Sequence, residues 1–250
     1  IHFVGLGNYA AILGFTRTPE GLVPRDEYFW RYMYNTVFLM LGIPLGMALS
    51  FICALLMNQS LRGITLYRAI FFLPTVCSTV AVAVVWRWVY DADWGLLNQG
   101  LQLLGVAHPP RWLLDPSWAK PALILMGLWM GVGGYNCVLY LAGLQNIPPE
   151  LYEAAELDGA NWWQRTLCVT WPMLAPTSFF ILVMSLISGF QGHFVAIHIM
   201  TGGGPAGATT NLLYYIYQSA CALAMVLFAI IFACTMVQWR LAKHSTEAAL

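Results

Sequence analysis

The sequence predicts an all-α, polytopic transmembrane helical bundle, and both its composition and the length of its apolar stretches indicate this fold class. Of the 250 residues, 60% are hydrophobic and only 9% are charged, whereas a soluble domain is about 45–50% apolar and about 25% charged. A soluble domain of this size still needs a polar surface. The composition therefore excludes a water-soluble globular protein and predicts a chain surrounded by membrane lipid.

Five apolar stretches are close to the length of about 20 residues that a helix needs to cross the hydrocarbon core of a bilayer. Pro44 in the first stretch and Pro74 in the second are tolerated in bundles that are buried in lipid. Trp86 and Trp88 lie at one end of the second stretch, as in an interfacial aromatic belt, and Arg87 between them is interpreted as a snorkelling anchor. The five predicted spans are 35–57, 69–90, 121–144, 172–189 and 219–239.

Charge and motifs exclude several functions. There are 11 basic and 11 acidic residues, so no excess charge points to nucleic acid as a partner. Neither lysine, Lys120 or Lys243, belongs to a Gly-Lys-Ser/Thr phosphate loop, so the chain does not hydrolyse ATP by that route. The six cysteines form no CxxC pair and are interpreted as small apolar residues, not as a disulfide framework or a metal site.

The loop between the third and fourth spans, 145–171, carries four acidic residues and one basic residue. Pro148 and Pro149 favour a helix start, and Glu150 suits the positive end of that helix. Gly159 is expected to end this helix, and 160–169 can form a second one that includes Trp162 and Trp163. At 100° per residue, Leu151, Ala154, Ala155 and Asp158 share one face, while Glu150, Glu153 and Glu156 line another.

Two interpretations of this helical pair are open. One is a hairpin that lies on the bilayer surface. Helices of that kind are rich in lysine and arginine, whereas this one is acidic. A face of small residues beside carboxylates therefore favours the second interpretation, docking into a cleft on a soluble protein.

The spacing Glu153-Ala154-Ala155, three residues, Gly159, nine residues and Val169-Thr170-Trp171-Pro172 resembles the EAA loop of binding-protein-dependent ABC importer permeases. The family usually ends this motif Ile-x-Leu-Pro, so Val169 and Trp171 depart from it. Other segments resemble landmarks of the carbohydrate type, and most of all its maltose-permease-like subunit. These segments are Phe3–Tyr9, Tyr67–Pro74, Trp86–Trp88, Leu144–Pro148 and Thr201–Pro205.

The resemblance implies an ABC importer permease fold, with residues 1–250 as a single transmembrane permease domain and 145–172 as a cytoplasmic coupling loop within it. Residues 1–33 are interpreted as an amphiphilic loop, and a sixth span is expected before residue 1. The family also carries about a dozen more residues near Ala220, which implies a shortened outer loop or omitted residues there. The implied location is a bacterial or archaeal plasma (inner) membrane, crossed several times.

The function implied is the pore-forming subunit of an ATP-driven importer that moves solute by alternating access, without a cofactor and without catalysis of its own. The implied partners are two ATP-binding subunits, a second homologous permease and an extracytoplasmic solute-binding protein. Glu153 would meet a basic group on the ATPase, Ala154 and Ala155 would allow close contact, and Gly159 would provide the bend. Asp158 is assigned to the same coupling contact.

Polar and aromatic residues inside the spans are candidates for the solute path, because polarity within a membrane is costly. The resemblance implies solute contacts in two regions, which contain Tyr135 and Asn136, then Phe190, Gln191 and His193. The alternative is that Asn136 bonds across helices and His193 lies at the water interface. The spacing of His193 and His198 does not suggest a metal site.

Two other classes of function compete with the importer hypothesis. A membrane enzyme would need a convergent acid, base or metal cluster at membrane depth. An ion-coupled secondary transporter of a small polar solute usually shows buried ionisable groups or repeat symmetry, and it leaves the acidic loop unexplained. Within the importer hypothesis the solute stays open among oligosaccharides, monosaccharides, polyols and glycerol phosphates. Glycerol phosphates would favour a cationic lining, for which Arg87 and His193 are candidates.

Overall fold

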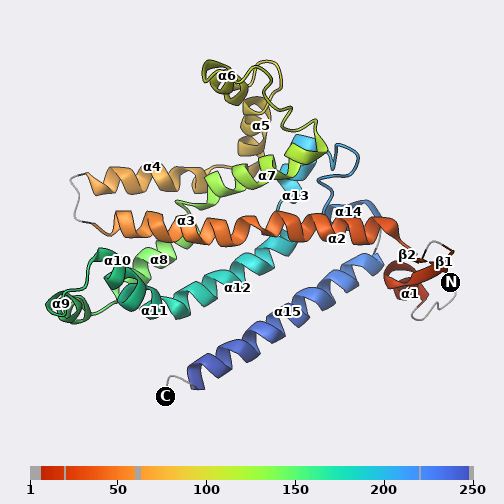
Figure 1. Ribbon diagram of the computed structural model, residues 1–250. Coiled ribbons are helices and arrows are strands. Elements are labelled where there is room, and N and C mark those ends of the chain that lie inside the picture. The colour runs from red at the N-terminus through yellow and green to blue at the C-terminus, as the bar shows by residue number, and fades with distance from the viewer. Residues whose placement is uncertain (1–6, 20, 60–62, 220, 248–250) are drawn as a thin grey trace. The chain divides into compact units, whose positions relative to one another are not determined.

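The computed structural model describes residues 7–19, 21–59, 63–219 and 221–247, and most of them are helical (Figure 1). The described chain forms two compact units. The first unit comprises 1–41, 79–125 and 186–250 as far as these are described, and the second comprises 42–78 and 126–185. Ala220 and the residues before Gly7 lie outside the described residues, as do the expectations attached to them.

The N-terminal segment contains regular structure where the sequence suggested a loop. A short helix, α1 (Gly7–Leu13), precedes an antiparallel hairpin of β1 (Phe15–Thr18) and β2 (Gly21–Pro24). Asp26 then caps α2 (Glu27–Met40), since its side chain accepts a hydrogen bond from the Phe29 N–H at 3.0 Å. The four-residue strands and the seven-residue helix are too short to show a clear hydrophobic period in the sequence.

Each predicted span corresponds to helical structure. The bounds are α2 with α3 (Gly42–Met57), α4 (Ile64–Val76) with α5 (Thr79–Val89), α7 (Pro116–Gly131) with α8 (Tyr135–Gln145), α12 (Ala175–Gln191) and α15 (Cys221–Glu247). By length and composition, Glu27–Met57 and Ala175–Thr201 are each able to cross a membrane among the described residues, and the number rises to four if each of the two interrupted pairs is one span. Within α15, Met225–Val237 is a shorter apolar helix.

The first unit contains α2, α5, α6 (Leu96–Leu103), α13 (Phe194–Ala196), the π-helix η2 (Ile197–Thr201), α14 (Leu212–Ser219) and α15. Its apolar core consists of Phe29, Phe190, Leu212, Val226 and Leu227. The segment between α12 and α14 is irregular: His193, Gly202 and Gly203 all have positive φ. This unit therefore combines long helices with an irregular stretch, in which threonine hydroxyls donate hydrogen bonds to backbone carbonyls such as those of Gly203 and Gly204.

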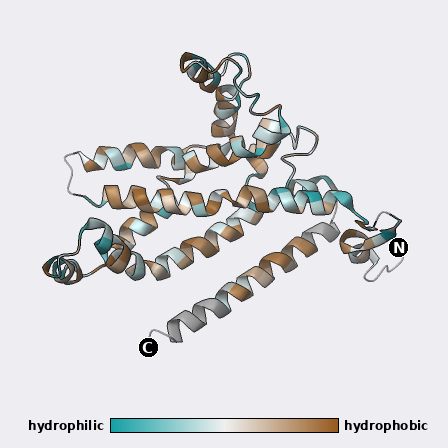
Figure 2. Cartoon of the chain, in the orientation of Figure 1, coloured by the Kyte–Doolittle hydropathy of each residue, from teal (hydrophilic) through white to brown (hydrophobic). Residues whose placement is uncertain are grey.

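The second unit contains α3, α4, α8, α9 (Pro149–Leu157), α10 (Trp162–Arg165), η1 (Thr166–Thr170) and α11 (Trp171–Met173). Helices α3 and α8 pack closely through small residues, with Cys53, Ala54 and Cys137 among the buried ones. These two cysteines fit the prediction of small buried residues, but Cys77 and Cys168 are exposed: Cys77 lies at the bend that follows α4, and Cys168 lies in η1. Figure 2 shows hydrophobic residues recurring along α3 and α4, as expected for helices in lipid.

Candidate functional site

The acidic loop begins with a helix whose start and end follow from its sequence. Pro149 is at the first turn of α9, where a missing N–H costs nothing, and Glu150 lies at the positive end of the helix dipole. At the other end, the Ala160 N–H donates to the Ala155 carbonyl at 2.9 Å and the Gly159 N–H to the Glu156 carbonyl at 3.0 Å. This pair of bonds is a Schellman motif, and it requires the left-handed φ of 76° that Gly159 adopts.

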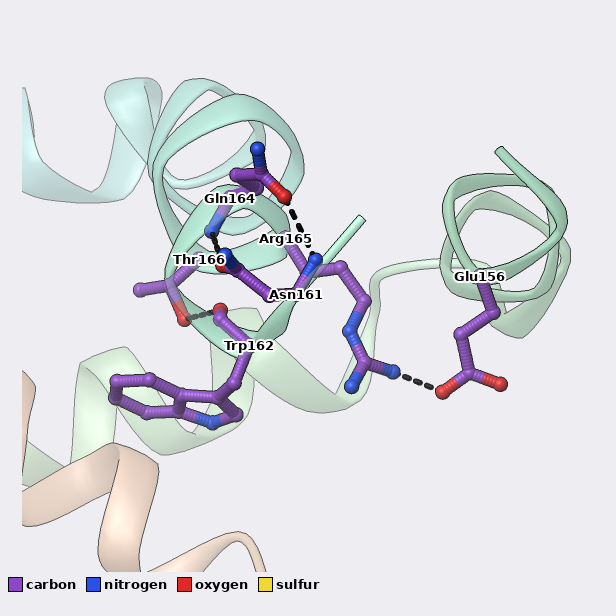
Figure 3. A network of polar contacts seen from close by, with 6 residues as sticks. All are labelled: Glu156, Asn161, Trp162, Gln164, Arg165 and Thr166. Atoms are coloured by element: carbon purple, nitrogen blue, oxygen red, sulfur yellow. Dashed lines mark hydrogen bonds and ion pairs between the residues drawn. The ribbon is translucent and has the colours of Figure 1, made fainter. Parts of the chain in front are cut away.

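A capping box starts the second helix of the loop. The Asn161 side-chain oxygen accepts a hydrogen bond from the Gln164 N–H at 2.9 Å, and the Gln164 side-chain oxygen accepts one from the Asn161 N–H at 2.8 Å (Figure 3). The expected second helix, 160–169, is only partly α-helical, because α10 passes into the π-helix η1 at Thr166. A π-turn is a local insertion that hydrophobic periodicity does not reveal.

Two side-chain contacts join the helices of the loop across the glycine turn. The Arg165 guanidinium forms an ion pair with the Glu156 carboxylate (Figure 3). The Tyr152 hydroxyl lies 2.9 Å from the Thr170 hydroxyl, which connects α9 to η1. Contacts on both sides therefore bridge the turn at Gly159.

The structure exposes most of the residues that the sequence assigns to docking. Glu153, Ala154, Asp158 and Gly159 are exposed, while Ala155 is half-buried. These residues therefore lie on a surface that a partner can reach, although α9 also packs inward through Tyr152.

Leu157 is a further candidate that the sequence analysis missed. Its side chain is 90% exposed and lies directly between Glu156 and Asp158. An apolar side chain between two acidic ones at the end of a polar helix is the signal that could have identified it. Its exposure adds an apolar contact to the acidic docking surface.

The predicted solute-path residues are divided between the two units. In the second unit, Tyr135 is 60% exposed at the start of α8, and the Asn136 amide nitrogen lies 3.5 Å from the Ser185 hydroxyl. The exposed Tyr135 side chain can meet a solute. The Asn136 side chain instead makes a contact across helices, which was the alternative role given for it above.

In the first unit, Phe190 is only 7% exposed and belongs to the apolar core, so its ring does not face an open path in this conformation. Gln191 is exposed. His193 is half-buried with a φ of 65°, and its Nδ1 has no hydrogen-bond partner among the described residues. Gln191 therefore presents an exposed polar group, whereas the Phe190 ring and the His193 Nδ1 atom are buried.

No group of three or more metal-ligating side chains occurs within the part of the chain that the structure describes. The same part contains a polar network that sequence reasoning missed. The Lys120 ammonium donates to the Asn35 side-chain oxygen at 3.0 Å and lies 4.7 Å from the ring centre of Tyr34 and 4.8 Å from that of Phe38. The sequence signal that could have identified this network is a lysine within an apolar stretch, followed directly by a proline.

A bundle of apolar helices that presents a rigid acidic helical pair at its surface has the architecture of a transport permease. The sequence model of the family described as "Binding-protein-dependent transport system inner membrane component" matches residues 42–239. The chain belongs to this family, which confirms the family predicted from the EAA-like loop and the predicted all-α permease fold.

Several relatives are similar over most of the chain. It is 32% identical to the sn-glycerol-3-phosphate transport system permease protein UgpA of Yersinia pestis, across 98% of this chain and 82% of the relative. It is 38% identical to the lactose transport system permease protein LacF of Rhizobium radiobacter, across 77% of this chain and 65% of the relative.

A solved structure supports the same fold. The crystal structure of a bacterial ABC transporter involved in the import of the acidic polysaccharide alginate superposes with a TM-score of 0.80 at 25% identity, across 98% of this chain and 84% of the other. A second structure of the bacterial alginate transporter, in complex with its alginate-pentasaccharide-bound periplasmic protein, gives a TM-score of 0.77 at 26% identity, across 90% and 80%. The chain is therefore an inner-membrane component of a transport system that works with a solute-binding protein.

Proposed function

We propose that the chain is a pore-forming subunit of an ATP-driven importer for hydroxylated solutes, namely sugars, polyols or glycerol phosphates. The single observation that carries this proposal is the family match, which includes the whole acidic loop. The relatives named for glycerol phosphate, lactose and alginate support a hydroxylated solute as the class. In this proposal the chain lies in a bacterial or archaeal plasma membrane, as a multi-pass protein beside a second homologous permease.

The loop 145–172 is the coupling element in this proposal, and it docks on one of two ATP-binding subunits. Glu153 supplies a carboxylate for a basic group on the ATPase, and Asp158 supplies a second carboxylate at the end of α9. Ala154 and Ala155 allow a close approach because their side chains are short. The turn at Gly159, bridged by the Glu156–Arg165 ion pair, supports this role because a rigid contact transmits movement from the ATPase to the spans.

Transport follows from the same arrangement by alternating access. Closure of the ATPase dimer moves the docked loops, and the spans rock between inward-facing and outward-facing states. Tyr135, Asn136, Phe190, Gln191 and His193 are the proposed solute-path residues, and the burial of Phe190 implies that it reaches solute only in another conformation. The chain itself needs no cofactor and no catalytic group in this scheme, because ATP hydrolysis is carried out by the partner subunits.

Co-purification tests the coupling role. The tagged chain is expressed with its neighbouring gene products and purified in mild detergent, beside the variants Glu153→Lys and Glu27→Lys. Both substitutions reverse one exposed charge, but Glu27 lies on α2 in the first unit, whereas the loop belongs to the second. We expect wild type and Glu27→Lys to retain an ATPase subunit and a second permease, and Glu153→Lys to lose the ATPase while keeping the permease.

Recovery of no ATPase with the wild-type chain would overturn the importer proposal. Uptake into proteoliposomes then distinguishes the ATP-driven importer from the remaining alternative, an ion-coupled secondary transporter. Uptake that requires ATP and ignores ionophores supports the importer. Uptake that needs no ATP and stops when the ion gradient collapses supports the secondary transporter.

A further inference from the structure

The first unit contains a polar cavity that the coupling loop and the predicted solute path do not use. Its volume is about 570 Å³, which lies within the range of roughly 300–1,000 Å³ that is typical of small-molecule sites. Its walls come from the end of α5, the turn at 91–93, the segment 111–114, η2 and the glycine-rich segment after η2. All of these parts belong to one compact unit, so the cavity is defined by that unit alone.

Two arginines line this cavity without a carboxylate partner. Arg87 comes from α5 and Arg111 from the loop that follows α6. Among the described residues, the ion pair of Glu156 with Arg165 is the one that forms, so neither cavity arginine is in ion-pair contact with an acidic side chain. Arg87 makes only a long contact of 3.4 Å from its Nη1 to the Ile199 carbonyl. A guanidinium that is not paired offers a fork of N–H donors suited to a phosphate or a carboxylate.

The same cavity also offers acceptors. One carboxylate oxygen of Asp91 accepts hydrogen bonds from the Trp94 N–H at 2.9 Å and the Asp93 N–H at 3.0 Å. These bonds lower the pKa of Asp91, so it stays ionised at neutral pH and its second oxygen can accept from a hydroxyl group. Asp93 is exposed at the same wall. Carboxylates suit hydroxyl donors and repel other acids, so they fit the hydroxylated part of a ligand.

His198, in η2, also lines the cavity. Its Nδ1 lies 3.4 Å from the hydroxyl of the buried Tyr214, and its ring stacks on Phe194 at 5.9 Å between ring centres. Packing thus fixes the orientation of an imidazole that lines the cavity. Fixed polar groups on several walls distinguish a binding site from a shallow surface dip.

We infer that this cavity is a binding subsite for a hydroxylated solute that carries an acid group. The guanidinium groups of Arg87 and Arg111 bind the phosphate or carboxylate, and Asp91 and Asp93 bind the hydroxyl groups. The inference rests on the proposed import function and gives it a solute class. It also decides between the two roles that the sequence left open for Arg87, in favour of a cationic lining over a snorkelling anchor.

Saturation-transfer NMR on the full permease complex in phosphatidylcholine nanodiscs tests this inference, because the method detects weak ligands. The probes are two matched pairs, sn-glycerol 3-phosphate with glycerol and glucuronate with glucose. We expect signals from the two acids and signals at least fivefold weaker from the two neutral compounds. The variants Arg87→Gln and Arg111→Gln each lower the acid signals at least threefold, whereas Arg17→Gln, on the exposed strand β1, leaves them unchanged.

Several results would overturn the inference. Absence of an acid preference in the wild-type complex would do so, as would acid signals that survive in the Arg87→Gln, Arg111→Gln double variant. Unchanged signals combined with a loss of ATPase stimulation by the solute-binding protein would instead make the cavity a protein-docking surface. Acid signals that vanish when phosphatidylglycerol replaces part of the lipid would assign it to a lipid headgroup. Co-purification of the ATPase is independent of these arginines, so the proposed function can stand if the subsite fails.

Discussion

The two compact units are stabilised by different means. In the first unit, polar side chains bind backbone across long sequence separations: the Asn35 amide donates to the carbonyls of Gly207 and Thr210 at 3.0 and 2.8 Å. The Thr36 hydroxyl accepts from the Leu212 N–H at 3.0 Å. In the second unit, α3 and α8 pack through small and apolar side chains such as Cys53, Ala54 and Cys137.

The physical reason for this difference is the backbone of each unit. A regular helix satisfies its own N–H and C=O groups, so helices in lipid need only close packing, which small residues permit. In the irregular segment 202–211, side chains supply part of the hydrogen bonding, and leaving a buried backbone group unpaired would cost several kcal/mol. Polar residues such as Asn35 and Thr36 therefore pair with backbone groups in the first unit. Between α3 and α8 the backbone groups are paired within each helix, so polar side chains are not needed there.

The substitution with the largest expected effect disrupts the close packing of the second unit. A Cβ atom at Gly133 would lie 2.2 Å from the Phe71 carbonyl oxygen of α4, whereas one at Gly131 would meet nothing within 4 Å. We expect Gly133→Ala to lower the free energy of unfolding by about 3 kcal/mol, since backbone must shift to admit it. Thermal unfolding of the purified chain measures this, with Gly131→Ala as the matched control. Equal melting temperatures for the two variants would contradict the packing argument.

The substitution with the second largest expected effect disrupts the polar network of the first unit. Asn35→Leu removes two hydrogen bonds to backbone and the acceptor of the Lys120 ammonium. Because two buried carbonyls and a cation lose their partner, we expect a loss of about 2–3 kcal/mol. A double-mutant cycle with Lys120→Met sharpens the test, because the two side chains act as one network. Strictly additive losses would show that Asn35 and Lys120 do not depend on each other.

A smaller effect tests whether the second unit also relies on hydrogen bonds near the loop. Tyr152→Phe keeps the ring and removes the contact with the Thr170 hydroxyl. We expect a loss of about 1 kcal/mol in stability, together with weaker retention of the ATPase, because α9 is then held less firmly. Tyr67→Phe on the exposed face of α4 is the control. A Tyr152→Phe variant with normal stability and normal ATPase retention would argue against this anchor.

The smallest effect on stability belongs to the ion pair of the loop. The side chains of Arg165 and Glu156 are 27% and 61% exposed, so solvent screens their attraction. We expect Arg165→Gln to change the free energy of unfolding by only about 0.5 kcal/mol while ATPase stimulation falls severalfold. The charge-exchanged double variant, Glu156→Arg with Arg165→Glu, should restore part of that stimulation. No recovery would mean that Arg165 acts through the partner and not through Glu156.

The first helix and the turn of the acidic loop could be predicted from the sequence, whereas the π-helix η1 could not. Pro149, the acidic residues and Gly159 are local signals, and each acts through the backbone of its own helix or turn. The exposure of Leu157 was not predicted, because exposure depends on what the rest of the chain covers. The predicted coupling and solute-path roles remain proposals, since they concern partners and conformations beyond this single chain.

The sequence by itself determined the class of the protein, because membrane insertion depends on apolar length and low charge, and these are properties of contiguous residues. It also determined the acidic loop, whose caps and turn are set by neighbouring residues. Only the tertiary structure decided which polar side chains meet across the chain. Asn35 and Thr210, or Arg87 and Arg111, are brought together by folding and not by spacing. Hydrogen bonds and charges act over a few ångströms in space, whereas sequence patterns report only on residues within one helix or turn.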